Sequence, residues 1–472
     1  MRSNPLSHHF VRRPLAGALL LALGLVFAAS AGATDISEPL TGVLTAPGSV
    51  GLGFVTRVEG SPYRDAGTRT DILPLYQYEG ERLFLHSNQA GLKLFNTPEQ
   101  RLDVFVEKRL EGTPVDPQPA SLAGMAPRHA GTDVGLSYRY SQPWGAVQAD
   151  LLRGTGTASR GTEFRLGYSY DWRSGPWMLR PAVNVALRDA KLNDYYYGVL
   201  PGEATASRAA YAPGAGVNAT VGLYGSYDLS QRWRLLGGVS ATLLDSKIRN
   251  SPIIKSGVVP AVYVGALYDF GSRSPELATQ STPTYFKLLY GKATEDGCHL
   301  IKIVTARCLA TASNNPTSIT AIQVGKPFIQ NFNGWPVDLV TYVGLTHHDD
   351  RGLQPNGLQV DLFLKAFYTG FPWNDRLKTR LGFGMGVSMA QRVPYIEESS
   401  QAALGERTSR LLHHLDPTVD VSLGDLVGSR SLKDTFVGIG VSHRSGILRK
   451  SRLLGNVYGG SNYIYTYLET AL

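Results

Sequence analysis

The chain has 472 residues, of which 43% are hydrophobic and 18% charged, and its formal net charge is +8. The first 33 residues carry three arginines and no acidic residue, which leaves +5 for the rest of the chain. A charge this small over so long a chain, without a run of Lys or Arg, excludes a typical nucleic-acid binder. Abundant Gly and Tyr with few Met fit a β-barrel better than a soluble α/β enzyme.

The N-terminal segment is typical of a secretory signal peptide. Arg12 and Arg13 precede an apolar stretch, and Ala31-Gly32-Ala33 is a small-residue cleavage site. The arginine pair also occurs in twin-arginine signals, but Pro14 and the barrel pattern favour the ordinary export route. We predict a signal peptide over residues 1–33. The rest of the chain has no long apolar helix, so any membrane insertion must use strands.

Amphipathic strands account for most of the chain that follows. From Phe164 to Trp172 the even positions are apolar or aromatic, and the odd positions are small or polar. Residues 381–389 repeat the pattern, with small residues at 382, 384, 386 and 388. Since side chains alternate across a strand, each strand has one apolar face. A soluble β-sandwich shows the same period, so the connections must separate the two folds.

The predicted connections alternate between short and long. This is the pattern of an outer-membrane barrel, which has tight periplasmic turns and long external loops. One connection, 87–89, is a tight hairpin where a long external loop is expected. The twelve strands predicted in the first part are 51–57, 72–78, 82–86, 90–95, 101–109, 132–141, 145–152, 162–172, 176–187, 216–227, 232–243 and 260–270.

A final barrel strand is predicted in mid-chain, because residues 260–270 alternate and end in an aromatic residue. Residues 271–283 are rich in Ser, Thr and Pro and are typical of a linker, here a periplasmic one. Eight more strands are predicted in residues 284–472: 285–293, 318–326, 338–347, 357–367, 378–390, 417–424, 435–443 and 461–469.

Two architectures are compatible with these all-β antiparallel strands. Either a twelve-stranded barrel over residues 34–270 precedes an eight-stranded barrel over 284–472, or one barrel holds about twenty strands. The internal terminal strand and the linker favour two barrels. Small inward residues at 382–388 also suit the narrow interior of an eight-stranded barrel.

Two kinds of cluster suggest cross-links or metals. Cys298 and Cys308 lie in one predicted external loop, where an oxidising compartment allows a disulfide. Two thiols alone supply only two of the four ligands of a structural zinc site. Residues 347–350 (His-His-Asp-Asp) and His413-His414 with Asp416 could hold a divalent cation or face lipopolysaccharide phosphates, although solvated loop residues are more common. No metal and no cofactor is predicted.

Three motifs in the first part resemble those of a known family. They are Leu73–Gly80 followed by Arg82-Leu83-Phe84, Asn193–Gly198, and Asp245–Ile248 with Ser251-Pro252. On these motifs, residues 36–270 resemble the MltA-interacting protein (MipA)/OmpV family of outer-membrane proteins. The resemblance implies a scaffold that brings a lytic transglycosylase and a penicillin-binding protein together for murein growth. Some members are discussed instead as porin-like or adhesive.

Tyr195, Tyr196 and Tyr197 fall in the longest external loop of the predicted first barrel. Adjacent tyrosines offer a large amphipathic surface that suits recognition. The alternative is a cluster that packs the loop or an aromatic girdle at the membrane rim. A murein partner would approach from the periplasm, where this barrel offers only short turns.

The penultimate strand carries a candidate catalytic pair. Val437, Ile439 and Val441 form an outward apolar row, and the alternation places His443 and Ser445 on the same face near the outer leaflet. Polar groups that face lipid lose solvation, which is unfavourable, so their presence there suggests a functional role. Neighbouring side chains at these positions would let His443 act as the base for a Ser445 nucleophile.

This part resembles the PagL-type lipid A deacylases, eight-stranded barrels with a His-x-Ser pair that removes an acyl chain from lipopolysaccharide. The resemblance implies that Ser445 is the nucleophile and His443 the general base. The family usually has Asn where this chain has Gly446, and an acid where it has Val457. In a simple hairpin register Asp416 lies across from His443 and could orient it.

The sequence therefore predicts a protein of the bacterial outer membrane, in contact with lipid and lipopolysaccharide. A scaffold in envelope biogenesis is the favoured function. Ester hydrolysis on lipid A through Ser445 and His443 is the alternative, and passage of small solutes through the first barrel is a third possibility.

Overall fold

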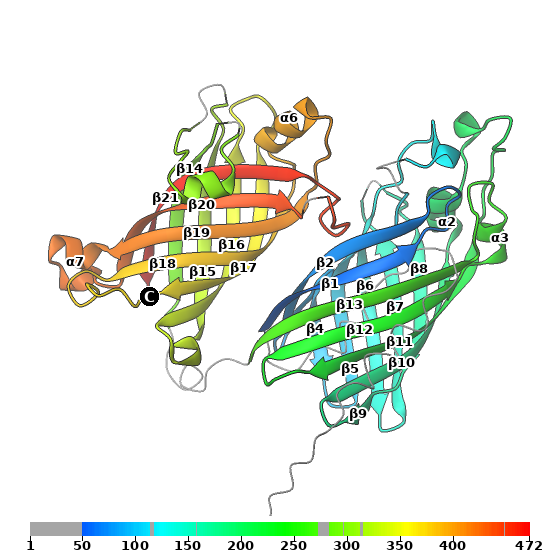
Figure 1. Cartoon of the computed structure of the whole chain (residues 1–472), viewed down its shortest axis with the longest axis horizontal. Helices are drawn as coiled ribbons and strands as arrows, with labels where there is room; N and C mark the ends of the chain where they lie inside the picture. The colour runs from blue at the N-terminus through cyan, green and yellow to red at the C-terminus, as the bar shows by residue number, and fades with distance from the viewer. Residues whose placement is uncertain are drawn as a thin grey trace, which may run out of the picture.

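The computed structural model describes residues 50–113, 118–156, 158–271, 283–295, 297–311, 315–447 and 449–472. Within these ranges the chain forms two closed antiparallel barrels, one of twelve main strands and one of eight (Figure 1). The predicted all-β fold with two barrels is confirmed, and the alternative of one large barrel is wrong. The predicted signal peptide and linker residues 272–282 lie outside the described residues.

The first barrel closes because β13 pairs with β1, and β10 pairs with β11. The predicted strand 162–172 is interrupted after Ser169, and the short β9 pairs instead with the start of β10. The strands are β1 Val50–Gly60, β2 Thr68–Glu79, β3 Leu83–His86, β4 Gln89–Asn96, β5 Gln100–Lys108, β6 Thr132–Gln142, β7 Gly145–Gly154, β8 Thr162–Ser169, β9 Trp172–Ser174, β10 Trp177–Arg188, β11 Gly216–Asp228, β12 Trp233–Leu243 and β13 Val258–Gly271.

The second barrel closes through pairing of β14 with β21. Its sixth strand begins at Leu411, so the predicted start at 417 is wrong. Pro417, which lacks an N–H, lies within the strand, where the ladder to β20 skips residues 416 and 417. The strands are β14 Tyr285–Ala293, β15 Ser318–Ile329, β16 Val337–Asp349, β17 Gly357–Tyr368, β18 Thr379–Ala390, β19 Leu411–Ser422, β20 Thr435–Gly446 and β21 Gly459–Ala471.

Short helices occur only in the connections of the described chain, and none of them is long and apolar enough to cross a membrane. The α-helices are α2 Ala190–Tyr197, α3 Ser246–Arg249, α5 Leu300–Val304, α6 Tyr395–Ala403 and α7 Leu423–Val427. The 3-10 helices are η1 Ala120–Leu122, η2 Pro201–Glu203, η3 Phe332–Gly334 and η4 Arg430–Leu432.

The two ends of each barrel differ in the length of their connections. We call the end that carries Gly271 and Tyr285 the linker end and the opposite end the loop end. Linker-end connections in the first barrel are short, as between β2 and β3, whereas loop-end connections reach the length of 189–215. The β3–β4 hairpin is the exception at the loop end, as predicted. This alternation assigns the linker end to the periplasm.

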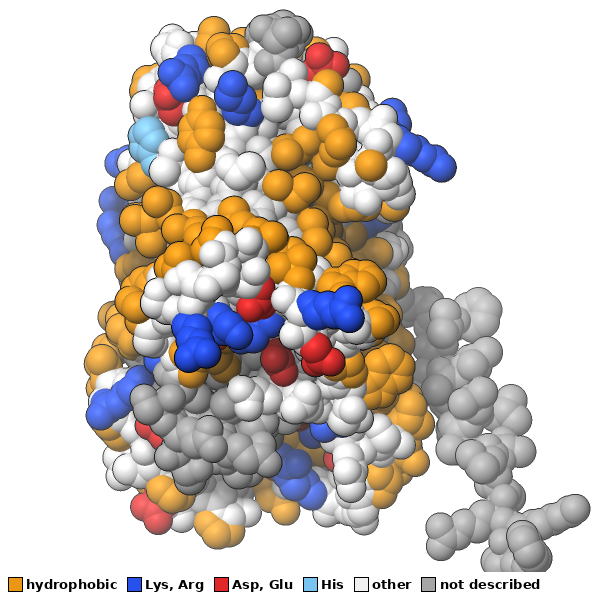
Figure 2. Space-filling view, turned by 90° about the vertical axis from the view of Figure 1, so that its left-hand side faces the viewer, with side chains coloured by type: hydrophobic (Ala, Val, Ile, Leu, Met, Phe, Trp, Pro, Cys, Tyr) orange, Lys and Arg blue, Asp and Glu red, His pale blue; other side chains and the backbone are white. Residues whose placement is uncertain are grey.

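Apolar side chains cover the outside of both barrels. Phe164, Leu166 and Tyr168 are each 40–47% exposed on β8, and Phe383 is 47% exposed on β18. Figure 2, which faces the second barrel, shows a broad apolar band around a patch where charged side chains gather. So large an apolar surface suits a lipid environment.

Charged side chains fill the inside of the second barrel. The Arg380 guanidinium donates to both carboxylate oxygens of Asp420, at 2.8 and 2.9 Å, and to Glu469 at 2.8 Å. Lys365 Nζ lies 2.5 Å from Asp416 Oδ2. Because these groups are buried, each charge depends on its partner for the solvation that it has lost.

Replacing Arg380 by Leu leaves two buried carboxylates without their cation. We expect the free energy of unfolding in detergent to fall by about 3–5 kcal/mol. Arg351→Leu is the matched control, because its pair with Asp349 is largely exposed, and we expect it to cost at most about 1 kcal/mol. The free energy of unfolding of both variants is measured by titrating with urea and following the heat-modifiable electrophoretic mobility of the folded barrels. Equal losses would contradict the structural role of the interior pairs.

Candidate functional site

The outward face of β20 carries the predicted catalytic pair close to the loop end. Ile439 is exposed on this face, and His443 and Ser445 follow it at alternate positions, each half-buried. The structure thus places both side chains on the lipid side, as the alternation predicts. No hydrogen bond joins them in the described chain, and positions two apart on a strand are separated by about 7 Å.

Asn462 on β21 lies directly opposite His443 in the ladder. Its Oδ1 lies 2.7 Å from His443 Nδ1 and accepts the hydrogen bond when that nitrogen carries the proton. Its Nδ2 donates to the carbonyl oxygen of Cys298 at 3.1 Å, which fixes the orientation of the amide. An imidazole held through Nδ1 keeps Nε2 as its acceptor, the state that a general base requires.

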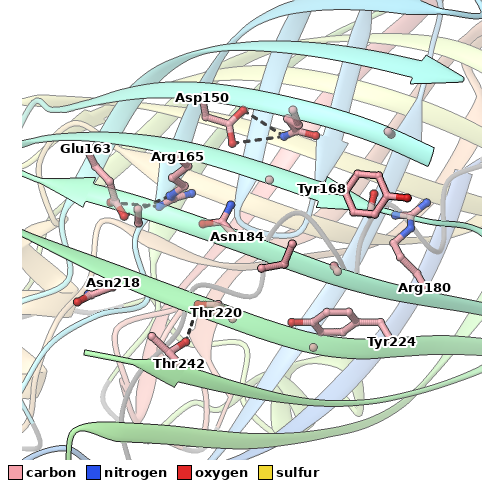
Figure 3. A pocket seen from close by; sticks show the side chains of 18 of the residues that line it. Asp150, Glu163, Arg165, Tyr168, Arg180, Asn184, Asn218, Thr220, Tyr224 and Thr242 are labelled. Atoms are coloured by element: carbon pink, nitrogen blue, oxygen red, sulfur yellow. Dashed lines mark hydrogen bonds and ion pairs between the residues drawn. The ribbon is translucent and has the colours of Figure 1, made fainter. Parts of the chain in front are cut away.

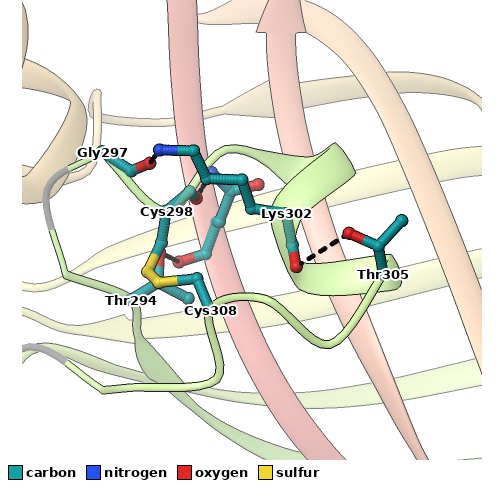
Figure 4. The surroundings of a disulfide bond; sticks show 7 residues. Thr294, Gly297, Cys298, Lys302, Thr305 and Cys308 are labelled. Atoms are coloured by element: carbon teal, nitrogen blue, oxygen red, sulfur yellow. Dashed lines mark hydrogen bonds between the residues drawn. A yellow bond between two sulfur atoms is a disulfide. The ribbon is translucent and has the colours of Figure 1, made fainter.

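A disulfide between Cys298 and Cys308 holds the loop that contacts Asn462 (Figure 4). The loop contains α5, and Lys302 Nζ donates to the carbonyl oxygen of Gly297 at 2.9 Å. The disulfide is the pairing that the sequence suggests. Through the Cys298 carbonyl it connects a covalent restraint to the side chain that holds His443.

Asp416 does not orient His443, so that prediction is wrong. The residue opposite His443 on β19 is Leu415, and Asp416 therefore points to the other face of the sheet. There it is fully buried inside the barrel with Lys365 and Lys287. β19 ends at Ser422, where α7 begins, so the hairpin register differs by one position from the simple one, which exchanges the inner and outer faces.

The candidate pair lies beside the contact between the two barrels. His413 is the cross-strand neighbour of Ser445 on the outer face. The ring of His413 stacks on Tyr76 of β2 with centroids 5.9 Å apart, and the Tyr76 hydroxyl hydrogen-bonds to its Nδ1. The outer surface around Ser445 therefore lies along the border between the barrels.

The predicted cation clusters do not converge. His347 and His348 are consecutive strand residues on opposite faces, and His348 Nε2 is bonded to Gln359 inside the barrel at 2.9 Å. His413 and His414 diverge in the same way, with His414 inside. Across the described ranges, no group of three or more His, Cys, Asp or Glu side chains could hold a metal ion.

The first barrel contains a cavity of about 130 Å³ lined by charged and polar side chains (Figure 3). Arg109 donates to Asp133 at 2.9 Å and to Glu163 at 2.6 Å, and Arg188 makes two 2.9 Å bonds to Glu111. Figure 3 shows side chains from neighbouring strands turned toward this space. Five arginines and three carboxylates are among the residues that line it.

The three predicted recognition tyrosines are the last three residues of α2 and pack the loop end of the first barrel. Tyr196 and Tyr197 are fully buried, in a cluster with Tyr63 and other apolar residues. The Tyr63 hydroxyl donates to the carbonyl oxygen of Tyr196 at 2.9 Å. Only Tyr195 is partly exposed. The prediction of a recognition surface built from all three tyrosines is therefore wrong, because two of them pack the loops of the barrel.

Glu203 and Arg128 hold the same loop cap through an ion pair. Burial acts to raise the pKa of Glu203, but hydrogen bonds from Arg128 and from the backbone N–H groups of Leu200 and Ala126 lower it below the usual value. The carboxylate is thus stabilised at neutral pH. Its contribution is lost when the pH falls through the lowered pKa.

Comparison with known proteins identifies the first barrel. The sequence profile described as MltA-interacting protein MipA matches residues 50–270, from β1 to the last strand. The first barrel belongs to the MltA-interacting protein (MipA) family. The MltA-interacting protein of Escherichia coli K12 is 26% identical over 253 residues, which are 53% of this chain and 98% of that protein.

Two further relatives of the MipA-family barrel are named outer-membrane proteins. Omp26La of Vibrio anguillarum is 27% identical over 38% of this chain and 71% of that protein. OmpV of Vibrio cholerae is 29% identical over 29% of this chain and 53% of that protein. Together with the barrels, they show that this is an outer-membrane protein, as predicted. The alignment with the siderophore receptor PirA from Acinetobacter baumannii covers 91% of this chain and 81% of that chain. Its sequence identity is 10% and its TM-score is 0.24, which is too low to indicate a shared fold.

The sequence reasoning missed Asn462 as a partner of His443. A register count would have found it, because the hairpin of β20 and β21 pairs His443 with Asn462 as regularly as it pairs Gly446 with Gly459. The resemblance to the PagL-type deacylases instead implies an acid at the place in the chain that Val457 occupies here. The contacts of the β20–β21 loop with the MipA-family barrel were also missed, since no local pattern reports them.

Tyr196→Ala in the MipA-family barrel removes a fully buried aromatic side chain from the loop cap. We expect a local loss of about 3–5 kcal/mol, because the cavity cannot be refilled within the cluster. Limited proteolysis in detergent should cleave loops 109–131 and 189–215 much faster than in the native protein. Tyr195→Ala, at the partly exposed neighbour, is the control and should change cleavage little. Equal cleavage of both variants would contradict the packing role.

Proposed function

We propose that the protein is a membrane-anchored interaction protein of cell-envelope biogenesis that binds a lytic transglycosylase. The observation that carries this proposal is the match of the first barrel to the MipA family over nearly the whole length of a relative named for its interaction with MltA. A second murein enzyme, a penicillin-binding protein, is the further partner that the resemblance implies.

The second barrel supplies the periplasmic surface that the first barrel lacks. Its linker-end connections include α7 and η4, whereas those of the first barrel are mostly short turns. Leu426 and Val427 on α7 are 54% and 61% exposed. An exposed apolar pair bordered by the charged residues Lys433 and Asp425 has the composition of a protein contact site. Because α7 lies at the periplasmic end, a murein enzyme that approaches from the periplasm could bind there, although the first barrel offers only short turns on that side.

Capture of murein enzymes tests the interaction. We expect the purified full-length protein in detergent to retain a lytic transglycosylase, and the double change of Leu426 and Val427 to Asp to reduce retention by about tenfold or more, as for a lost hot spot. Leu404→Asp is the control, because Leu404 is 65% exposed at the loop end. The proposal fails if the native protein retains no transglycosylase, or if both variants bind equally.

A second function, hydrolysis of an acyl ester of lipid A, is favoured by the hydrogen bond between Asn462 and His443. In this proposal Ser445 Oγ attacks the acyl carbonyl, and His443 Nε2 takes its proton. His443 then protonates the leaving alkoxide, and water releases the fatty acid from Ser445 in the same way. Asn462 takes the place of the acid that usually orients the histidine. The site lies on the lipid side at the loop end, where lipopolysaccharide is found.

Mass spectrometry of lipid A from expressing cells tests the hydrolase. We expect loss of one acyl chain with the native protein and none with Ser445→Ala. His443→Ala should lower the rate by about 10²-fold or more, the scale of a lost general base. Ser442→Ala is the matched control, because Ser442 lies on the same strand but faces the interior. Identical spectra from native protein and Ser445→Ala would remove this function.

A further inference from the structure

The wall of the first barrel has a notch at its loop end, between β2 and β5. The short β3 pairs with β2 only at residues 77–79, so among the described strands residues 68–75 of β2 have a partner on one side only. Pro74 lies in this stretch, where the lack of an N–H costs no ladder bond. The notch exists because the β3–β4 hairpin ends early, at the one connection that breaks the alternation of loop lengths.

A loop of the second barrel occupies the notch. The loop joins β20 to β21, and we call its residues 449–458 the plug loop. In Figure 1 this segment reaches from the second barrel toward β2. The N–H of Ile72 donates to the carbonyl oxygen of Lys450 at 2.5 Å, so the plug loop pairs with the free edge of β2. Such an edge is the usual site for the addition of an extended segment.

Arg452 spans the notch from one side to the other. Its N–H donates to Asp71 Oδ1 at 2.9 Å, on the β2 side. Its guanidinium donates to the carbonyl oxygen of Leu110 at 2.7 Å, just beyond β5, and to Glu59 at 3.3 Å. One residue therefore bonds to β1, to β2 and to the chain that follows β5.

The plug loop also inserts apolar side chains into the barrel. Leu453 and Leu454 are fully buried, and Val457 is 1% exposed. They belong to one apolar cluster with inward residues of six strands of the first barrel, which are Val55, Leu73, Leu75, Met178, Tyr224, Leu236, Ala261, Tyr263 and Leu267. The loop therefore enters the lumen and does not merely cover the outside.

The charges around Arg452 allow the plug loop to leave. Arg57 and Arg69 already pair with Glu59, at 2.9 and 2.8 Å, and Arg57 also pairs with Asp71. Two carboxylates thus face three guanidinium groups when the plug loop is in place. Withdrawal of Arg452 leaves two of each sign, so no buried charge is left without a partner.

We propose that the notch is a lateral binding site for a short basic and apolar polypeptide segment, and that the plug loop is its occupant in this protein. The site offers carboxylates to an arginine, a strand edge to the backbone, and an apolar hollow to two leucines. With the plug loop in place, the lumen of the first barrel is closed from the side. When the loop is displaced, the lumen opens between the two barrels.

Accessibility of a cysteine inside the notch tests this proposal in the full-length protein. Leu75→Cys places the reporter in the apolar hollow, where Leu75 is 2% exposed, and the two native cysteines are joined and do not compete. We expect a small maleimide to label the reporter slowly. Adding Arg452→Glu, which sets a third carboxylate beside Glu59 and Asp71, should speed labelling about tenfold or more through local opening.

A second variant and a peptide keep the test independent of one substitution. Replacing residues 449–456 by Gly and Ser should also speed labelling, and a synthetic peptide with the sequence of residues 449–455 should slow it again. The same peptide with Glu in place of Arg452 should have no effect. Arg351→Glu, in another loop-end connection, is the matched control.

The outcome is judged only on protein whose heat-modifiable mobility shows that both barrels are folded. Fast labelling in both variants, reversed by the native peptide alone, supports the proposal. Equal labelling of native and variant proteins, or a peptide without effect, overturns it. The result does not depend on murein binding or on lipid hydrolysis.

Discussion

Every backbone N–H and C=O group of a segment that crosses a membrane needs a partner within the protein, because the hydrocarbon core offers none. Two closed barrels meet this requirement almost everywhere in this chain. The early end of the β3–β4 hairpin breaks it along β2, where an unpaired group would cost several kcal/mol. The plug loop restores pairing at Ile72 and carries Arg452 across the notch. The wall of the first barrel is therefore completed by the second.

The same contact positions the candidate chemistry. Tyr76 lies on β2 below the notch and holds His413, whose cross-strand neighbour is Ser445. His443 is held from the other side by Asn462, which in turn depends on the loop closed by the disulfide. The outward pair thus lies where the barrels meet. Displacement of the plug loop would change the surroundings of both the lumen and this pair.

Much of the fold follows from local patterns in the sequence. Alternation and loop length predicted both barrels, the end of the first barrel near Phe270, and the outward position of His443 and Ser445. They failed in two places. The hairpin register of β19 and β20 differs by one position from the simple one, so Asp416 was placed on the wrong face. Tyr196 and Tyr197 are buried by loops that no local pattern brings together. The contact of Asn462 with His443 follows only from the register of the β20–β21 hairpin. The contacts of Arg452 with Glu59, Asp71 and Leu110 follow only from the packing of the second barrel against the first.

Amide hydrogen exchange along β2 tests most directly whether the second barrel completes the first. In the native full-length protein, residues 68–75 should exchange slowly, because Ile72 is paired with Lys450 and the plug loop excludes water. With residues 449–456 replaced by Gly and Ser, the same segment should exchange much faster, whereas β12, paired on both sides, should not change. Equal protection of residues 68–75 in the two proteins would contradict the account.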